Sequence, residues 1–162
     1  MKEIEHNIMT IGLVVELTTS QTKNFEIIQK HWINFNHELK KWKLAQVHGN
    51  WVKYGITFKI DEQYFYLTSI PTTDKSFPKH FKRLDIPKGM YEVFAHKGEM
   101  RNIKNTLFNI YKVMLPKSNL TFEKETESGI LHFEKYDYRF QWNKPTSIID
   151  IYLPLKTEHN DE

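Results

Sequence analysis

The feature that most constrains the fold is a pattern of hydrophobic residues that occurs twice along the chain. Each copy predicts a short apolar strand, an amphipathic helix and two alternating strands that can pair as a hairpin. The copies cover about residues 9–70 and 90–154 and are joined by a polar linker over about 71–80. At 162 residues the chain has the usual size of one domain. We therefore expect a duplicated strand–helix–strand–strand motif within a single domain, 1–162.

The helix of the first copy is the most clearly marked element. Ser20 or Thr22 can cap its N-terminus, and apolar residues then recur at intervals of three and four positions. This apolar face comprises Phe25, Ile28, Trp32, Phe35, Leu39 and Trp42. The spacing predicts a helix of about six turns. We expect its aromatic stripe, Phe25 and Trp42 included, to pack in the core.

The remaining segments complete the two copies. The predicted strands are Met9–Glu16, Val52–Ile60, Gln63–Ile70, Phe81–Ile86, Met90–His96, Ile130–Asp137 and Ser147–Pro154. A second helix is predicted to begin after Gly98 and to end at Pro116. Its apolar face comprises Ile103, Leu107, Ile110, Tyr111 and Met114. The charged ends of the chain, residues 1–7 and 157–162, are expected to fray.

Composition and motifs exclude several kinds of chemistry. The chain contains no cysteine, which excludes thiol nucleophiles, iron–sulfur clusters, cysteine-ligated zinc and disulfides. It also lacks the glycine-rich nucleotide-binding motifs, the HExxH zinc motif and the GxSxG hydrolase motif. His31 and His37 share a helix but lie about 240° apart around it, so they cannot chelate one metal ion. We therefore expect no metal and no cofactor.

Charge and hydropathy indicate where the protein acts. The 23 Lys and Arg residues exceed the 20 Asp and Glu residues only slightly, and just three of the cations are Arg. Nucleic-acid-binding proteins usually concentrate a larger excess on one face. No signal peptide begins the chain, and no apolar run approaches the ~18 residues of a membrane span. We expect a cytoplasmic protein that contacts neither nucleic acid nor membrane directly.

The two predicted C-terminal strands place an acid on one face of a sheet. Because side chains alternate along a strand, one face carries His132, Glu134 and Tyr136 on the first strand and Asp150 and Tyr152 on the second. The other face carries Leu131, Phe133, Ile149, Ile151 and Leu153. We expect the aliphatic face to lie under the helices. Periodicity alone leaves open whether the face with the acid is a binding surface or an ordinary solvent-exposed face.

These residues belong to a longer series of motifs. The series runs Trp32-x-x-Phe35, Tyr54-Gly55-Ile56, Tyr66, Ile86-Pro87-x-Gly89-x-Tyr91-x-Val93-Phe94-x-His96-x-Gly98, Ile110-Tyr111, Leu115-Pro116-x-Ser118, Phe133-Glu134-x-Tyr136 and Asp150-Ile151-Tyr152-x-Pro154. In this order and spacing the chain resembles, over about residues 5–156, the GyrI-like domain. The same domain is the effector-binding domain of bacterial AraC- and MerR-type multidrug regulators. One departure is Ser69, where relatives usually carry Gly.

The resemblance implies an α+β fold in which two helices pack on one curved antiparallel sheet. It also implies a pocket between the repeats for bulky, often cationic, aromatic compounds. Glu134 falls on the family's acid, which contacts the positive charge of the ligand. The aromatic residues expected to contribute to ligand binding are Trp32, Tyr66, Tyr91, Tyr136 and Tyr152. Because a carboxylate among aromatic walls is poorly solvated, the pKa of Glu134 should be raised.

Three functions remain open, in order of preference. The chain begins at its first strand without a helix-turn-helix, so we expect a stand-alone domain that sequesters hydrophobic, cationic small molecules or reports them to a separate regulator. The second alternative is a protein inhibitor of a DNA topoisomerase, like the gyrase inhibitor of the family. The third is a hydrolase of reactive toxins, with Glu134 as general base and Asp150 or a tyrosine assisting. Binding without catalysis is preferred over an enzyme.

Overall fold

The computed structural model describes residues 1–44, 51–73, 76–117 and 129–156. The strands are β1 (Lys2–Ile4), β2 (Ile8–Glu16), β3 (Lys53–Ile60), β4 (Gln63–Pro71), β5 (Lys82–Ile86), β6 (Gly89–Lys97), β7 (Ile130–Tyr136) and β8 (Ile148–Pro154). The helical elements are α1 (Gln21–Lys41), η1 (Met100–Asn102), α2 (Ile103–Asn109), η2 (Ile110–Met114) and α3 (Leu115–Lys117). The predicted strands and helices therefore occur in the predicted order.

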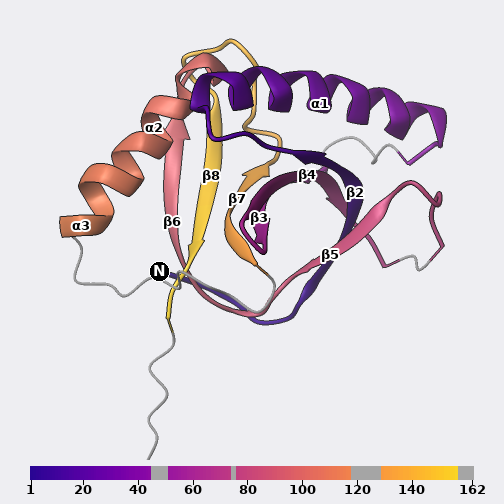
Figure 1. Cartoon of the computed structure of the whole chain (residues 1–162), viewed down its shortest axis with the longest axis horizontal. Helices are drawn as coiled ribbons and strands as arrows, with labels where there is room; N and C mark the ends of the chain where they lie inside the picture. The colour runs from indigo at the N-terminus through magenta and orange to yellow at the C-terminus, as the bar shows by residue number, and fades with distance from the viewer. Residues whose placement is uncertain (45–50, 74–75, 118–128, 157–162) are drawn as a thin grey trace, which may run out of the picture.

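One eight-stranded sheet organises the molecule. Its strand order is β1-β6-β8-β7-β3-β4-β2-β5, and every neighbouring pair is antiparallel. The order β6-β8-β7 on one side of the centre mirrors β2-β4-β3 on the other, as a duplicated motif requires. Figure 1 shows the sheet curling into an open half-barrel, with α1 across the top of the view and α2 and α3 beside β6. The α+β fold expected from the resemblance is confirmed.

The two faces of the curled sheet hold separate cores. The inner core joins residues from strands along the whole sheet, namely Tyr54, Ile56, Phe58, Leu67, Ile86, Tyr91, Ile130, Phe133 and Tyr152. The helix-facing cores join α1 to β2 and β4 and join the second helical region to β8. Both faces are therefore buried, which has consequences for how a strand pattern can be interpreted.

Helix α1 begins as the sequence predicts but ends one residue before Trp42. Ser20 caps it by accepting a hydrogen bond from the backbone N–H of Lys23. Phe35 and Leu39 are buried, in agreement with the predicted stripe. The expectation for Trp42 is wrong, because its side chain is 45% exposed and its Nε1 donates to Glu38 instead of packing in the core.

The N-terminal end is a second correction. Residues 1–7 are expected to fray, yet Lys2–Ile4 forms β1, whose Lys2 pairs with Tyr91 of β6. This strand is only three residues long and contains two charged residues and one apolar residue, so its edge pairing leaves little trace in the sequence. Residues 157–162 lie outside the described residues.

The second helical region is less regular than its apolar pattern predicts. It runs from η1 through α2 into a π turn, η2, and continues as α3 past Pro116. The backbone N–H of Leu115 bonds to the carbonyl of Ile110, five residues back, where an α-helix would use four. Because Pro116 has no N–H to donate to Lys112, the helix already lacks one regular bond in this turn. The prediction that Pro116 ends the helix is therefore off by about one residue.

Candidate functional site

A large cleft lies between the two helical regions and the helix-facing side of the sheet. Its volume is about 1350 Å³, which exceeds the usual ~300–1,000 Å³ of a small-molecule site. The N-terminal half of α1, the segment from η1 to α3 and strand β7 form its walls. Its large aromatic side chains are Phe25, Trp32, Tyr64, Phe108, Tyr111 and Trp142. The cleft therefore has the size and surface to hold a bulky apolar molecule.

Glu134 is the acid of this cleft. It lies on β7, lines the cleft and is only 4% exposed. The hydroxyls of Tyr66 and Tyr136 both donate to its Oε1, each at 2.8 Å. Burial raises the pKa of Glu134 to about 7, although the two hydroxyl hydrogen bonds pull it down. The direction agrees with the sequence-based expectation, and near neutral pH the carboxyl group exists in both protonation states.

The two tyrosines donate to Glu134 from strands β4 and β7 and are not among the residues that line the cleft. Trp32 Nε1 donates to the Tyr66 hydroxyl at 3.1 Å, so α1 is linked to the carboxyl group through Tyr66. The Trp32 ring also packs edge-on against Tyr136, with 5.0 Å between ring centroids. Opposite Glu134 on β3 is Gly55, where a Cβ would lie 1.9 Å from the Tyr66 hydroxyl oxygen. The absence of a side chain at Gly55 makes room for this arrangement.

His132 and Tyr111 complete the site, and neither is among the sequence-predicted binding residues. Nε2 of His132 lies 4.0 Å from Glu134 Oε2, and Nδ1 lies 2.6 Å from the Tyr111 hydroxyl. Burial lowers the pKa of His132 to about 4, so the ring is neutral at neutral pH. The alternation of His132 with Glu134 on one strand was a usable signal. Tyr111 belongs to the Ile110-Tyr111 motif of the resemblance, but its spacing also assigned it to the apolar face of the second helix, and it was not singled out as a binding residue.

The structure brings together four of the six predicted residues. Glu134 and Trp32 line the cleft, and Tyr66 and Tyr136 support the carboxyl group. The other two, Tyr91 and Tyr152, belong to the inner core on the opposite face of the sheet.

The expected grouping of Glu134 with Asp150 and Tyr152 is wrong. The register pairs Glu134 with Ile151, and Phe133 with Tyr152, and directly paired residues share a face. The aliphatic face of β8 therefore lies with Glu134 under the helices, as expected for β8. Phe133 of β7 lies in the inner core, which reverses the expectation for β7.

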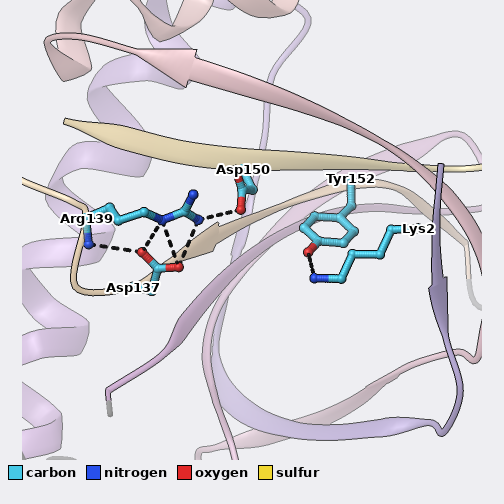
Figure 2. Close-up of polar contacts among 5 residues, drawn as sticks. All are labelled: Lys2, Asp137, Arg139, Asp150 and Tyr152. Carbon is cyan, nitrogen blue, oxygen red and sulfur yellow. Dashed lines mark hydrogen bonds and ion pairs between the residues drawn. The ribbon is translucent and has the colours of Figure 1, made fainter. Parts of the chain in front are cut away.

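Asp150 and Tyr152 have polar partners of their own (Figure 2). Asp150 and Asp137 both pair with the Arg139 guanidinium, which fastens the turn between β7 and β8. The Tyr152 hydroxyl accepts from Lys2 Nζ at 3.1 Å. Asp150 therefore faces an arginine on the side of the sheet away from the cleft, where it cannot assist Glu134 in catalysis.

The described part of the chain contains neither a candidate metal-binding cluster nor a helix that could span a membrane. Among those residues, no three histidine, aspartate or glutamate side chains lie close enough together to hold a metal ion. Within the same ranges, no helix has the length and hydropathy to cross a membrane.

Comparisons with known proteins agree with this fold. Residues 3–155 match the family model described as "Cass2: Integron-associated effector binding protein". The transcriptional regulator BrlR of Pseudomonas aeruginosa is 29% identical over 116 residues, which span 70% of this chain and 41% of BrlR. The chain thus matches well under half the length of that curated relative.

Solved structures share the fold at low sequence identity. The protein SAV2435 bound to tetraphenylphosphonium has a TM-score of 0.75 at 14% identity, covering 99% of this chain and 95% of that one. A putative transcription regulation protein of Staphylococcus aureus has a TM-score of 0.71 at 14% identity, covering 96% of each chain. An integron cassette protein of Vibrio cholerae has a TM-score of 0.61 at 15% identity, covering 96% of this chain and 94% of that one. With the family model matching nearly the whole chain, the resemblance to effector-binding domains is confirmed, and the chain belongs to the Cass2 family of integron-associated effector binding proteins.

Proposed function

We propose that the protein binds bulky hydrophobic cations in the cleft and that ionised Glu134 neutralises their charge. The observation that carries this proposal is a carboxyl group that is 4% exposed yet lines an otherwise mostly apolar cleft. No lysine or arginine of the described residues pairs with it, and His132 beside it is neutral. A ligand cation would supply the missing counter-charge.

The apolar walls would supply most of the affinity. Burying about 200 Å² of apolar ligand surface contributes about 5 kcal/mol before the entropy cost of binding. A cation over the face of a tryptophan or tyrosine adds about 0.5–2 kcal/mol, and Trp32, Tyr111 and Trp142 all line the cleft. Because these terms depend little on direction, we expect many ligands of similar size and charge to bind.

The relatives support this ligand class without identifying the ligand of this chain. The SAV2435 structure contains tetraphenylphosphonium, which is a bulky aromatic cation. BrlR is a transcriptional regulator, and this chain matches 41% of it. We further propose that the protein acts in the cytoplasm, where it sequesters its ligand or reports it to a separate regulator. A gyrase-type protein partner remains the alternative.

Replacing Glu134 by glutamine tests the role of its charge. Glu134→Gln keeps the volume and polarity of the side chain but removes the negative charge, so affinity for tetraphenylphosphonium should fall by about 1.5–3 kcal/mol. Affinity for triphenylphosphine oxide, a neutral aryl ligand, should change much less. Isothermal titration calorimetry of both ligands measures the difference.

Glu62→Gln is the matched control, because Glu62 is an exposed glutamate that is not among the residues lining the cleft, and the substitution removes the same charge. It should leave both affinities unchanged. Equal losses for the two ligands in Glu134→Gln would refute charge recognition and leave only an apolar cleft. Ligand turnover that Glu134→Gln abolishes, with binding retained, would instead indicate the hydrolase.

A further inference from the structure

The two oxygens of Glu134 have different surroundings. Both tyrosine hydroxyls bind Oε1, whereas Oε2 faces Nε2 of His132 at 4.0 Å. This distance is too long for a direct hydrogen bond. It does suit a third atom, since a donor nitrogen can lie about 2.9 Å from two acceptors spaced this far apart. Both side chains line the cleft, so that position is open to a ligand.

His132 can offer a lone pair at this position. Its Nδ1 lies 2.6 Å from the Tyr111 hydroxyl, and a phenol can accept a hydrogen bond as well as donate one. When Nδ1–H donates to Tyr111, Nε2 of the neutral ring is an acceptor. Burial keeps the ring neutral by lowering the pKa of His132 to about 4.

The other charged groups of the cleft do not compete for this role. Among its described lining residues, the remaining charged side chains are Lys104 and Lys112, both exposed on the second helical region. Ammonium groups donate hydrogen bonds and cannot accept them. The pair formed by Glu134 Oε2 and His132 Nε2 is thus the place where a cation with N–H groups would be held.

We propose that His132 determines specificity in this cleft: with Glu134 it favours cations that carry N–H groups, such as protonated amines and amidines, over quaternary cations. The inference rests on the proposed function, because it takes Glu134 to be the anion of the site. An N–H cation donates to both Oε2 and Nε2. A quaternary cation has no hydrogen to donate and gains only the charge attraction and apolar contact.

The test compares two ligands that differ only at nitrogen, biphenyl-4-ylmethylammonium and its N,N,N-trimethyl analogue. The quantity measured by calorimetry is the ratio of their dissociation constants, quaternary over amine. From wild type to His132→Phe this ratio should fall at least about tenfold, the scale of one hydrogen bond to a charged donor. Taking the ratio between proteins cancels the different hydration of the two ligands.

Tyr111→Phe gives a second measurement if His132→Phe does not fold. It removes the partner of Nδ1 from an exposed helical position, and the ratio should fall in the same direction by a smaller factor. Tyr138→Phe is the control, because Tyr138 is 72% exposed and is not among the residues that line the cleft, and it should leave the ratio unchanged.

Different results would overturn the role of His132 and the proposed function. An unchanged ratio in both His132→Phe and Tyr111→Phe overturns the role of His132, while the proposed function stands if Glu134→Gln still weakens both cations. If neither cation binds, or if Glu134→Gln weakens neither, the proposed function fails and the inference fails with it.

Discussion

Gly55→Ala should destabilise the protein by about 2–3 kcal/mol, near the upper end of the cost of overpacking, and should abolish high-affinity cation binding. The added Cβ would lie 1.9 Å from the hydroxyl oxygen and 2.7 Å from Cζ of Tyr66, and 3.2 Å from Glu134 Oε1. Tyr66 is fully buried and bonded to Trp32 and Glu134, so it cannot move aside without losing both bonds. Urea denaturation and calorimetry with tetraphenylphosphonium measure the two effects.

A double-mutant cycle identifies the cause. Tyr66→Phe removes the hydroxyl that the new Cβ meets first, so Gly55→Ala should cost less stability in the Tyr66→Phe background than in the wild type. The backbone of Gly55 does not have a positive φ angle, so backbone strain cannot explain the effect. Additive free energies in the cycle would show that the close contact with Tyr66 is not what fixes glycine at this position.

The free energy of unfolding should depend on pH with opposite signs in the variants Glu134→Gln and His132→Gln, relative to wild type. In the folded site Glu134 has a pKa of about 7 and His132 of about 4, against ordinary values of 4.5 and 6.5. Between about pH 4.5 and 6.5 the folded pair holds one proton, on Glu134, and the unfolded pair also holds one, on His132. The wild-type pair therefore contributes almost no slope in this range.

In each variant only one titrating group of the pair remains, so its effect on the pH dependence of the free energy of unfolding is no longer cancelled by its partner. In Glu134→Gln the unfolded state binds the extra proton on His132, so the free energy of unfolding should rise by about 2 kcal/mol between about pH 5 and 6.5, relative to wild type. In His132→Gln the folded state binds the extra proton, on Glu134. The free energy of unfolding should therefore fall by about the same amount between about pH 5 and 6.5, relative to wild type. Urea denaturation at both pH values checks this. Parallel pH profiles for the three proteins would mean that neither group is neutral in the folded site.

The fold was largely predictable because in most helices and strands the apolar residues recur at one regular spacing. The stripe from Phe25 to Leu39 has helical spacing, and the strands around the turn at Asp61 alternate over many residues. The miss at Trp42 reflects the usual uncertainty of a helix end. Strand β1 was missed because three residues at the edge of a sheet give no measurable period.

The site was only partly predictable because both faces of β8 are buried. Ile151 and Tyr152 are both almost fully covered, so alternation could not show which of them lies beside Glu134. That choice depends on the register of β7 against β8, and β7 also contains an irregularity opposite Thr57 and Phe58 that shifts its alternation. The identity of the acid came from its motif. Its neighbours depend on pairing between strands and on the helix above, which a single sequence does not contain.

The π turn η2 is a place where the second helical region can gain or lose a residue without a change in the strands that carry Glu134 and its tyrosines. A π turn holds one residue more than an α-helical turn, and each residue of a helix is rotated by about 100° from the last. Loss of one residue here would restore α-helical spacing and rotate the helical residues on one side of the deletion by about 100° relative to those on the other, while Glu134 and its tyrosines on the strands stayed in place. Single-residue insertions and deletions in this turn would therefore change which helical side chains face Glu134, while the acid itself stays on its strand.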